Sequence, residues 1–156
     1  MPRGFEVVSY FKNKGVILPT RATEGSAGYD IRVFTDGITV EIPPNGRHLF
    51  HTGVKAFMEP DVVLMLYVRS SVGIKKGLVL SNSVGVIDAS YYNNEKTEGE
   101  LLISLLNTSN VSQYIEYNQR VVQGIFTRFL TVYDDQLYPK AKRQGGIGST
   151  DLSACA

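Results

Sequence analysis

The stretch DVVLMLYVRSSVGIKKGLVLSNSVGVIDASY, residues 61–91, contains three apolar runs separated by Gly, Ser and Asn. The runs 61–68, 78–80 and 85–88 are short and rich in β-branched or large apolar residues, which predicts buried strands bounded by turns. No segment of the chain has a strong helical stripe with a cap at each end. The stretch therefore predicts an all-β fold in which polar side chains follow directly on the ends of buried strands.

The rest of the chain fits this fold class. Ile38, Val40 and Ile42 alternate with polar residues up to Pro43-Pro44, which indicates a half-buried edge strand. The apolar runs 100–106 and 123–133 indicate further buried strands. Many short strands at close spacing predict a jelly-roll-like β-barrel with little helix. We expect residues 1–139 to form the barrel and 140–156, rich in Gly and Lys, to be a flexible C-terminal arm of the same domain.

Composition excludes several classes of function. The 156 residues fit one domain, and 16 Lys plus Arg against 15 Asp plus Glu give a charge of +1, so no global field favours nucleic acid or an anionic membrane. Because Cys155 is the single cysteine, there is no internal disulfide, which fits a reducing cytoplasm. His48, His51 and Cys155 do not make a zinc set. Without a signal peptide or a long apolar run, we expect a soluble cytoplasmic protein with no membrane contact.

Polar residues at two strand ends suit phosphate chemistry. The run 61–68 is followed by Arg69, Ser70 and Ser71, whose guanidinium and two hydroxyls can face phosphate oxygens. The alternative is a serine turn in which Arg69 forms a structural ion pair. Asp88 ends the run 85–88, so its carboxylate is partly desolvated and has a fixed direction, as a general base needs. The alternative is an Asp that starts a turn.

Other polar residues suit a nucleoside and its charges. Across a hairpin, Asn82 can offer an amide to a pyrimidine edge while Tyr91 packs against a sugar, although a turn Asn and an interfacial Tyr remain open. Asp30 lies in a Gly- and Ser-containing loop, where a structural role is the alternative. In NQRVVQ, Arg120 and Gln123 are three residues apart and lie on opposite faces of an extended segment, so different roles are expected. A buried salt bridge is the alternative for both.

Five motifs together carry a resemblance to a known family. They are AGYDI (27–31), RSSVG (69–73), NSVGVIDASY (82–91), NQRVVQ (118–123) and GGIGST (145–150). In order and spacing they resemble the trimeric dUTP pyrophosphatases, or dUTPases, from about residue 25 to residue 150. The resemblance implies a homotrimer with shared active sites that uses Mg²⁺ to hydrolyse dUTP to dUMP and pyrophosphate by water attack on the α-phosphorus. Such an activity limits uracil in DNA and supplies dUMP.

The resemblance also implies roles for single residues. Asp88 corresponds to the base that activates water, and Asp30 to the carboxylate that holds Mg²⁺ through water. Arg120 corresponds to a structural position. Asn82 and the backbone near Gly85 correspond to positions that recognise uracil, and Tyr91 to the ring that excludes a 2′-hydroxyl. The substrate-binding residues implied in full are Arg69, Ser70, Ser71, Asn82, Gly85, Tyr91, Gln123, Arg143, Gly146, Ile147, Gly148, Ser149 and Thr150.

The chain departs from the family pattern at three places. Ile147 stands where many dUTPases have a phenylalanine that stacks on uracil, and either Lys142 or Arg143 holds the place of the arginine that contacts phosphate. The link after Tyr91 is expanded to YYNNEKTEGE (91–100), as in some bacterial and phage members. Tyr92 is a candidate for the missing aromatic contact, with simple solvent exposure as the alternative. The 92–99 loop is a candidate surface for a protein partner.

Two rival functions remain open from the sequence. A dCTP deaminase-like enzyme would share the fold and the handling of a triphosphate, but the complete GVID motif and the Gly-rich arm argue against it. A dUTP-gated regulatory binding protein would use the expanded loop for a partner and the arm as the element that dUTP changes. A panel of nucleotides separates the first rival, and deletion of residues 93–98 tests the second.

Overall fold

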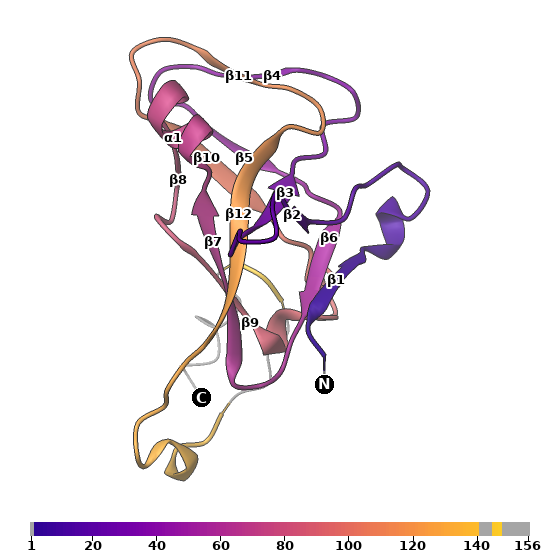
Figure 1. Ribbon diagram of the computed structural model, residues 1–156, viewed down its shortest axis with the longest axis vertical. Coiled ribbons are helices and arrows are strands. Elements are labelled where there is room, and N and C mark those ends of the chain that lie inside the picture. Colours follow the sequence, from indigo (N-terminus) through magenta and orange to yellow (C-terminus); the bar gives the residue numbers. More distant parts are fainter. Residues whose placement is uncertain (1, 141–144, 148–156) are drawn as a thin grey trace.

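The computed structural model describes residues 2–140 and 145–147 of the chain. These residues form mostly short strands, so the predicted all-β fold is confirmed (Figure 1). The helical elements are α1 (Ser70–Lys76) and the 3₁₀ turns η1 (Ser9–Phe11), η2 (Ala89–Tyr91) and η3 (Asp135–Leu137). The strands are β1 (Gly4–Val7), β2 (Thr20–Arg21), β3 (Tyr29–Arg32), β4 (Val40–Ile42), β5 (Arg47–Phe50), β6 (Val54–Phe57), β7 (Val62–Val68), β8 (Leu78–Leu80), β9 (Gly85–Asp88), β10 (Ile103–Asn107), β11 (Gln113–Ile115) and β12 (Arg120–Arg128).

Within the described residues, four antiparallel sheets make a jelly-roll-like arrangement. The largest has the order β2-β3-β12-β7-β9, and the others have the orders β5-β10-β8, β1-β6 and β11-β4. Figure 1 shows β12 as a long strand beside β7 through the middle of the molecule. Neighbouring strands in the largest sheet come from distant parts of the chain. Four of the five sequence motifs therefore lie on this sheet or at the ends of its strands.

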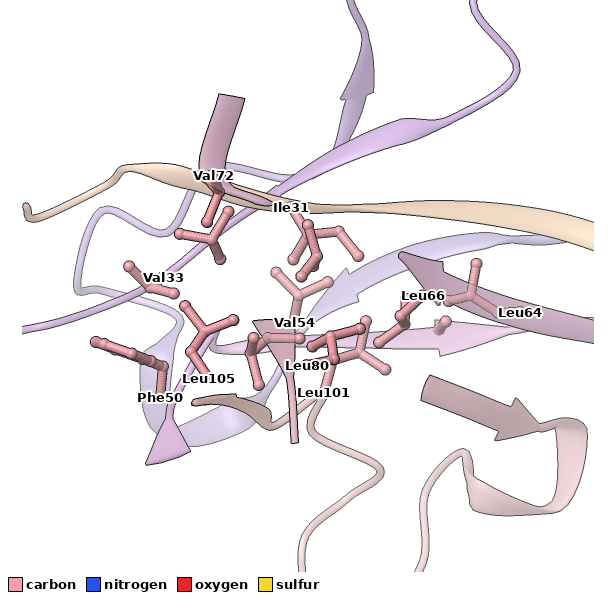
Figure 2. Close-up of a cluster of buried hydrophobic side chains, with 14 of the residues drawn as sticks. Ile31, Val33, Phe50, Val54, Leu64, Leu66, Val72, Leu80, Leu101 and Leu105 are labelled. Carbon is pink, nitrogen blue, oxygen red and sulfur yellow. The ribbon is translucent and has the colours of Figure 1, made fainter. Parts of the chain in front are cut away.

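The core lies between the sheets. Leu64 and Leu66 of β7 are buried, as are Ile31 of β3 and Leu105 of β10, and Figure 2 shows them in one cluster. Along β7 the alternate residue Tyr67 is partly exposed, so the strand turns one face to the core and the other outward. Burial of each such leucine contributes about 1.5–3 kcal/mol, so this cluster fixes the register of the largest sheet.

Several predicted strands agree with the structure, and others end elsewhere. The runs 61–68, 78–80 and 85–88 correspond to β7, β8 and β9, although β9 is an edge strand whose Val86 is 57% exposed rather than buried as predicted. The 36–44 segment contains β4, which pairs with β11 alone at a sheet edge. Ile38, predicted to face inward, is 63% exposed because β4 begins only at Val40. The last predicted strand, 123–133, is wrong at both ends. The strand β12 covers Arg120–Arg128, and beyond it Leu130 is exposed after the chain has left β7.

The segment after β7 is helical rather than an open loop. Arg69 has extended backbone angles at the N-terminal boundary of α1, and Gly77 ends the helix with a left-handed φ of 64°. A left-handed C-terminal residue favours glycine, which has no Cβ to clash. Lys75 and Lys76 in the last turn are favourable beside the helix carbonyls. With seven residues this helix is too short to give a periodic signal in the sequence.

No helix in the described part of the chain is long and apolar enough to cross a membrane.

Candidate active site

Asp30 lies between two arginines at one end of the largest sheet. Its Oδ1 is 2.8 Å from Nε of Arg69, and its Oδ2 is 3.0 Å from Nη1 of Arg120. The carboxylate is only 9% exposed, whereas the two guanidiniums are partly open to solvent. One carboxylate and two guanidiniums carry a net charge of +1, so this trio favours an anion.

A β-bulge in β12 builds this trio. Arg120 pairs with Arg32 and Val122 pairs with Ile31, so Val121 is an extra residue on β12. The carbonyl of Val121 accepts the backbone N–H of Arg69 at 3.0 Å. The bulge therefore positions both arginines. The sequence-based prediction that Arg120 and Gln123 lie on opposite faces is wrong. The extra residue changes the alternation, so that Arg120 bonds Asp30 and Gln123 lies on the same face as Asp30.

Gln123 is the cross-strand partner of both Asp30 on β3 and Tyr67 on β7. Residues directly opposite in an antiparallel pair point to the same face, so these three share the outer face of the sheet. Gly28 makes room for the glutamine, because a Cβ there would lie 2.6 Å from Oε1 and 3.0 Å from Cβ of Gln123. This contact gives a physical reason for the glycine in the AGYDI motif.

Ser70 and Ser71 follow Arg69 in the first turn of α1, and both are exposed. Their hydroxyls lie next to the Asp30 trio in the chain and are open to solvent. Together with Gln123, this end of the sheet offers hydroxyls, an amide and a net positive charge. The arrangement suits the binding of phosphate oxygens.

A second group of predicted residues lines a cavity of about 640 Å³ between β8, β9 and β10. Asn82, Gly85, Tyr91, Gly146 and Ile147 all contribute to it, so the structure brings together five of the residues expected to hold base, sugar and lid. Other lining residues are Arg47, Leu49, Leu66, Leu80, Ser81, Val86, Ile87, Leu102, Ile103 and Ser104. The mixture of apolar walls and a few polar groups is typical of a small-molecule site.

The turn that carries Asn82 joins two sheets. Leu80 ends β8 in one sheet and Gly85 starts β9 in another, so the expected hairpin is a tight turn rather than a paired ladder. Ser83 has a φ of 64°, and its N–H donates to the carbonyl of Leu80 at 2.9 Å. Asn82 is exposed at the tip of this turn, where its amide is accessible to a ligand.

Tyr91 is 7% exposed, and its hydroxyl donates to the carbonyl of Glu100 at 2.8 Å. Gly146 lies against the ring, since a Cβ there would be 3.2 Å from the phenolic oxygen. Ile147 follows, is 82% exposed, and lines the same cavity. The arm and the tyrosine therefore meet in the described structure. Lys142, Arg143, Gly148, Ser149 and Thr150 lie outside the described residues.

Asp88 ends β9 and is half-buried directly before the turn η2. Its cross-strand partner is Val63, near the start of β7, whereas Ser70 lies just beyond the end of β7. The path from Val63 to Ser70 is seven residues long, and at about 3.3 Å per residue it separates Asp88 from Ser70 by roughly 20 Å. A single chain thus holds the predicted base and the predicted phosphate contacts at opposite ends of one strand.

Tyr92 does not line the cavity that contains Ile147. Its hydroxyl donates to Oε2 of Glu6 at 2.8 Å, and its ring packs at 5.9 Å from that of Phe57. The hydrogen bond to Glu6 and partial burial raise the pKa of Tyr92. In this arrangement Tyr92 attaches the loop to β1 and β6, which argues against it as the substitute for the missing aromatic lid.

The 92–99 loop is also anchored by an ion pair and by hydrogen bonds. Lys55 is buried, with its Nζ 2.6 Å from Oδ1 of Asn93 and 3.2 Å from Oε2 of Glu98. The backbone N–H and the hydroxyl of Ser9 donate to the same Glu98 oxygen. These two bonds, with the Lys55 charge, hold the pKa of Glu98 below its usual value. The expanded loop is therefore bonded to the N-terminal segment, while Glu95 and Lys96 stay exposed.

The donor set fits magnesium that arrives with a triphosphate. Among the described residues, no group of three or more His, Cys, Asp and Glu could hold a metal ion. Asp30 uses one acceptor position on each oxygen for an arginine, and each carboxylate oxygen has a second. A water on a magnesium ion could occupy that second position. Magnesium usually keeps several waters and binds phosphate oxygens, which suits a site without a carboxylate cage.

Several residues of the cavity wall were not predicted from the sequence. Arg47 on β5 and the pair Ser81 and Ser104 contribute polar groups, and the two serine hydroxyls are 2.8 Å apart. They occur in segments that look like ordinary strands or turns, so no local motif marks them. Only the pairing of β10 with β5 and β8 brings them to the cavity.

Comparisons with known proteins match the chain to one family. A protein-family model described as dUTPase matches residues 14–151. A deoxyuridine 5'-triphosphate nucleotidohydrolase of Lactococcus lactis is 49% identical over 148 residues, covering 95% of this chain and 97% of the relative. One of Haemophilus influenzae is 39% identical over 137 residues, covering 84% and 85%. The crystal structure of a dUTPase from Streptococcus mutans superposes with a TM-score of 0.74 at 43% identity, covering 83% of this chain and 98% of that one.

Proposed function

The chain belongs to the dUTPase family and hydrolyses dUTP to dUMP and pyrophosphate, and we propose that Asp88 activates the attacking water. The observation that carries this proposal is the cavity that Asn82, Gly85, Tyr91 and Ile147 share beside the strand that Asp88 ends. A carboxylate with a fixed orientation at a strand end can orient a water molecule and accept a proton from it. Asn82 and the backbone near Gly85 bind uracil, and the ring of Tyr91 packs on the deoxyribose.

Arg69, Ser70, Ser71 and Gln123 bind the triphosphate. Their support is the net positive charge around Asp30 and the exposed hydroxyls at the start of α1. Asp30 would hold a magnesium ion through water, and the bound ion would supply charge stabilisation for the pyrophosphate that leaves. Catalysis is then mostly positioning and electrostatics. Gly146 and Ile147 of the arm cover the nucleotide, and their position beside Tyr91 and along the cavity supports this role.

We further propose that the active sites are shared within a homotrimer. A general base must reach its target directly or through one water. Asp88 and Ser70 cannot serve one α-phosphate within a single chain if about 20 Å separates them. The outer face of the sheet between them carries Val86 at 57% exposure and Tyr67 at 37%. A neighbouring copy would cover these apolar groups and bring its own Ser70 to Asp88.

Product analysis tests the activity. The protein is incubated with dUTP, dCTP, dTTP and UTP, each with and without Mg²⁺, and the products are separated. We expect dUMP and pyrophosphate from dUTP alone, with faster release in the presence of Mg²⁺. Release of dUTP and ammonia from dCTP would support the deaminase instead. Asp88→Asn keeps the size of the side chain and removes the base, so turnover should fall by about 10²–10⁴-fold while dUTP still binds.

Complementation tests the shared site. Asp88→Asn and Ser70→Glu, which sets a negative charge against the phosphates, are each expected to be inactive. After the two variants are unfolded and refolded together, random trimers contain both intact halves at about one quarter of their sites. Recovery of about a quarter of the wild-type activity supports sites between chains. A mixture that stays inactive would place the whole site within one chain.

The 92–99 loop also remains our candidate surface for a protein partner. Its anchored base and its exposed residues Glu95 and Lys96 support a fixed, solvent-facing surface. A pull-down with the full chain and with residues 93–98 deleted tests the idea. Retention of the same partner after the deletion would exclude the loop as its binding surface.

A further inference from the structure

Tyr91 is held at both ends by the expanded loop that follows it. Its backbone carbonyl accepts the side-chain N–H of Asn94 at 2.8 Å, and its hydroxyl donates to the carbonyl of Glu100 at 2.8 Å. The hydroxyl of Thr97 is 3.4 Å from the phenolic oxygen. Gly99 has a φ of 82°, and a Cβ there would lie 2.6 Å from the carbonyl oxygen of Tyr91. The loop thus closes tightly around both the backbone carbonyl and the hydroxyl of Tyr91.

Asn94 is the hub of this loop. It is 6% exposed, and its Oδ1 accepts the backbone N–H groups of Lys96 at 3.1 Å and Thr97 at 3.0 Å. Its Nδ2 donates to Tyr91 and lies 2.9 Å from the hydroxyl of Thr97. One side of the amide therefore shapes the loop, and the other side bonds the tyrosine. A buried amide whose donors and acceptor are all engaged has one orientation.

We propose that Asn94, together with Thr97, is a positioning residue that holds the Tyr91 ring against the sugar and so sets the discrimination between dUTP and UTP. The inference rests on the proposed contact of Tyr91 with deoxyribose. Steric exclusion of a 2′-hydroxyl works only if the excluding ring cannot retreat. A displacement of about 1 Å in a positioned group can change rates by up to about 10²-fold. The expanded loop is thus a specificity element, although none of its own residues after Tyr91 lines the cavity.

The test compares kcat/KM for dUTP and for UTP in Asn94→Asp. Aspartate keeps the acceptor that shapes the loop but replaces the donor to the Tyr91 carbonyl with an oxygen. We expect the dUTP to UTP ratio to fall about tenfold, the order expected when a buried partner is lost. Lys96→Ala is the matched control, because Lys96 is exposed and bonds Asn94 through its backbone. Its ratio should equal that of the wild type.

A second variant guards against misfolding. Thr97→Val keeps the shape and removes the hydroxyl near the tyrosine, so the ratio should fall in the same direction while thermal unfolding shows a folded protein. In Tyr91→Ala the ratio should already be low, and adding Asn94→Asp should lower it no further if the asparagine acts through the ring. A purely structural role would lower kcat/KM for both nucleotides equally.

Three results would overturn the proposal. They are an equal loss for both nucleotides, an unchanged ratio in both loop variants, and a further fall when Asn94→Asp is added to Tyr91→Ala. These results can be distinguished from failure of the proposed function, because in that case the wild type would not hydrolyse dUTP at all. If the wild type is active but Tyr91→Ala leaves the ratio unchanged, the sugar contact of Tyr91 is wrong and the role of Asn94 falls with it.

Discussion

Asp30→Asn tests whether the carboxylate organises the phosphate side of the site. The substitution keeps the shape of the side chain but leaves one acceptor oxygen, and its NH₂ group then faces a guanidinium donor. A hydrogen bond to a charged group contributes about 1.5–3 kcal/mol. Two such bonds are weakened at a side chain that is 9% exposed, but the arginines are 26% and 42% exposed, so solvent screens part of the loss. We expect the free energy of unfolding to fall by about 2 kcal/mol.

Thermal unfolding measures this loss. For a domain of this size, 1 kcal/mol corresponds to about 2–4 °C, so the melting temperature should fall by about 4–8 °C. Asp61→Asn is the matched control. The Asp61 carboxylate is 56% exposed, and the partner Nε of Arg128 is 3.5 Å away on a side chain that is 76% exposed. Because such surface pairs contribute about 0–1 kcal/mol, the control should shift the melting temperature by less than about 4 °C and by less than Asp30→Asn.

Activity of the same variant separates two roles of Asp30. Without the carboxylate, Arg69 loses its fixed direction, so KM for dUTP should rise about tenfold, the effect of losing about 1.4 kcal/mol of binding. If holding magnesium were the sole role, a high concentration of Mg²⁺ would restore KM. We expect KM to remain raised at saturating Mg²⁺. A variant that melts with the wild type and regains its KM in Mg²⁺ would refute the organising role of the trio.

Two further predictions concern other parts of the site. Gly28→Ala should displace Gln123, because Oε1 of Gln123 would lie 2.6 Å from the new Cβ, and KM for dUTP should rise several-fold in a steady-state assay. Gly25→Ala is the control, because a Cβ there would have nothing within 4 Å, and its KM should change little. Glu98 has a lowered pKa because Ser9 bonds its carboxylate, so its contribution to stability is present above the ordinary carboxylate pKa and is lost as pH falls through the lowered folded value. Melting curves of wild type and Glu98→Gln should therefore differ at neutral pH and converge in acid; a difference that persists in acid would contradict this linkage.

Much of the fold was predictable from local patterns. The runs that became β7, β8 and β9 are apolar, short and bounded by turn residues, and their ends matched the prediction closely. The predicted strand 123–133 extends too far for a physical reason. Residues 129–133 are apolar enough for a strand, but no strand in the described part of the chain lies beside them to bury them. Apolar character predicts burial only where a partner exists.

The site was predictable as a set of motifs but not as a geometry. Asn82, Tyr91 and Ile147 meet in one cavity as expected. Ion pairs of Arg69 and Arg120 were among the alternatives that the sequence left open. Their shared partner Asp30 could not be inferred, because it depends on a bulge in β12 that strict alternation along an extended segment does not predict. The role of Asn94 was equally hidden, since a turn asparagine and a buried hub look the same in a sequence.

Because of the bulge at Val121, the geometry of the phosphate site depends on the number of residues in β12. Val121 and Val122 are both fully buried, although neighbours along a regular strand point to opposite faces. Removal of one residue here would restore regular alternation and separate Arg120 from Asp30, while every residue after it kept its neighbours. Such a deletion would leave a well-folded barrel with an altered phosphate site. The phosphate side of the site therefore depends on the number of residues in this strand as much as on their types.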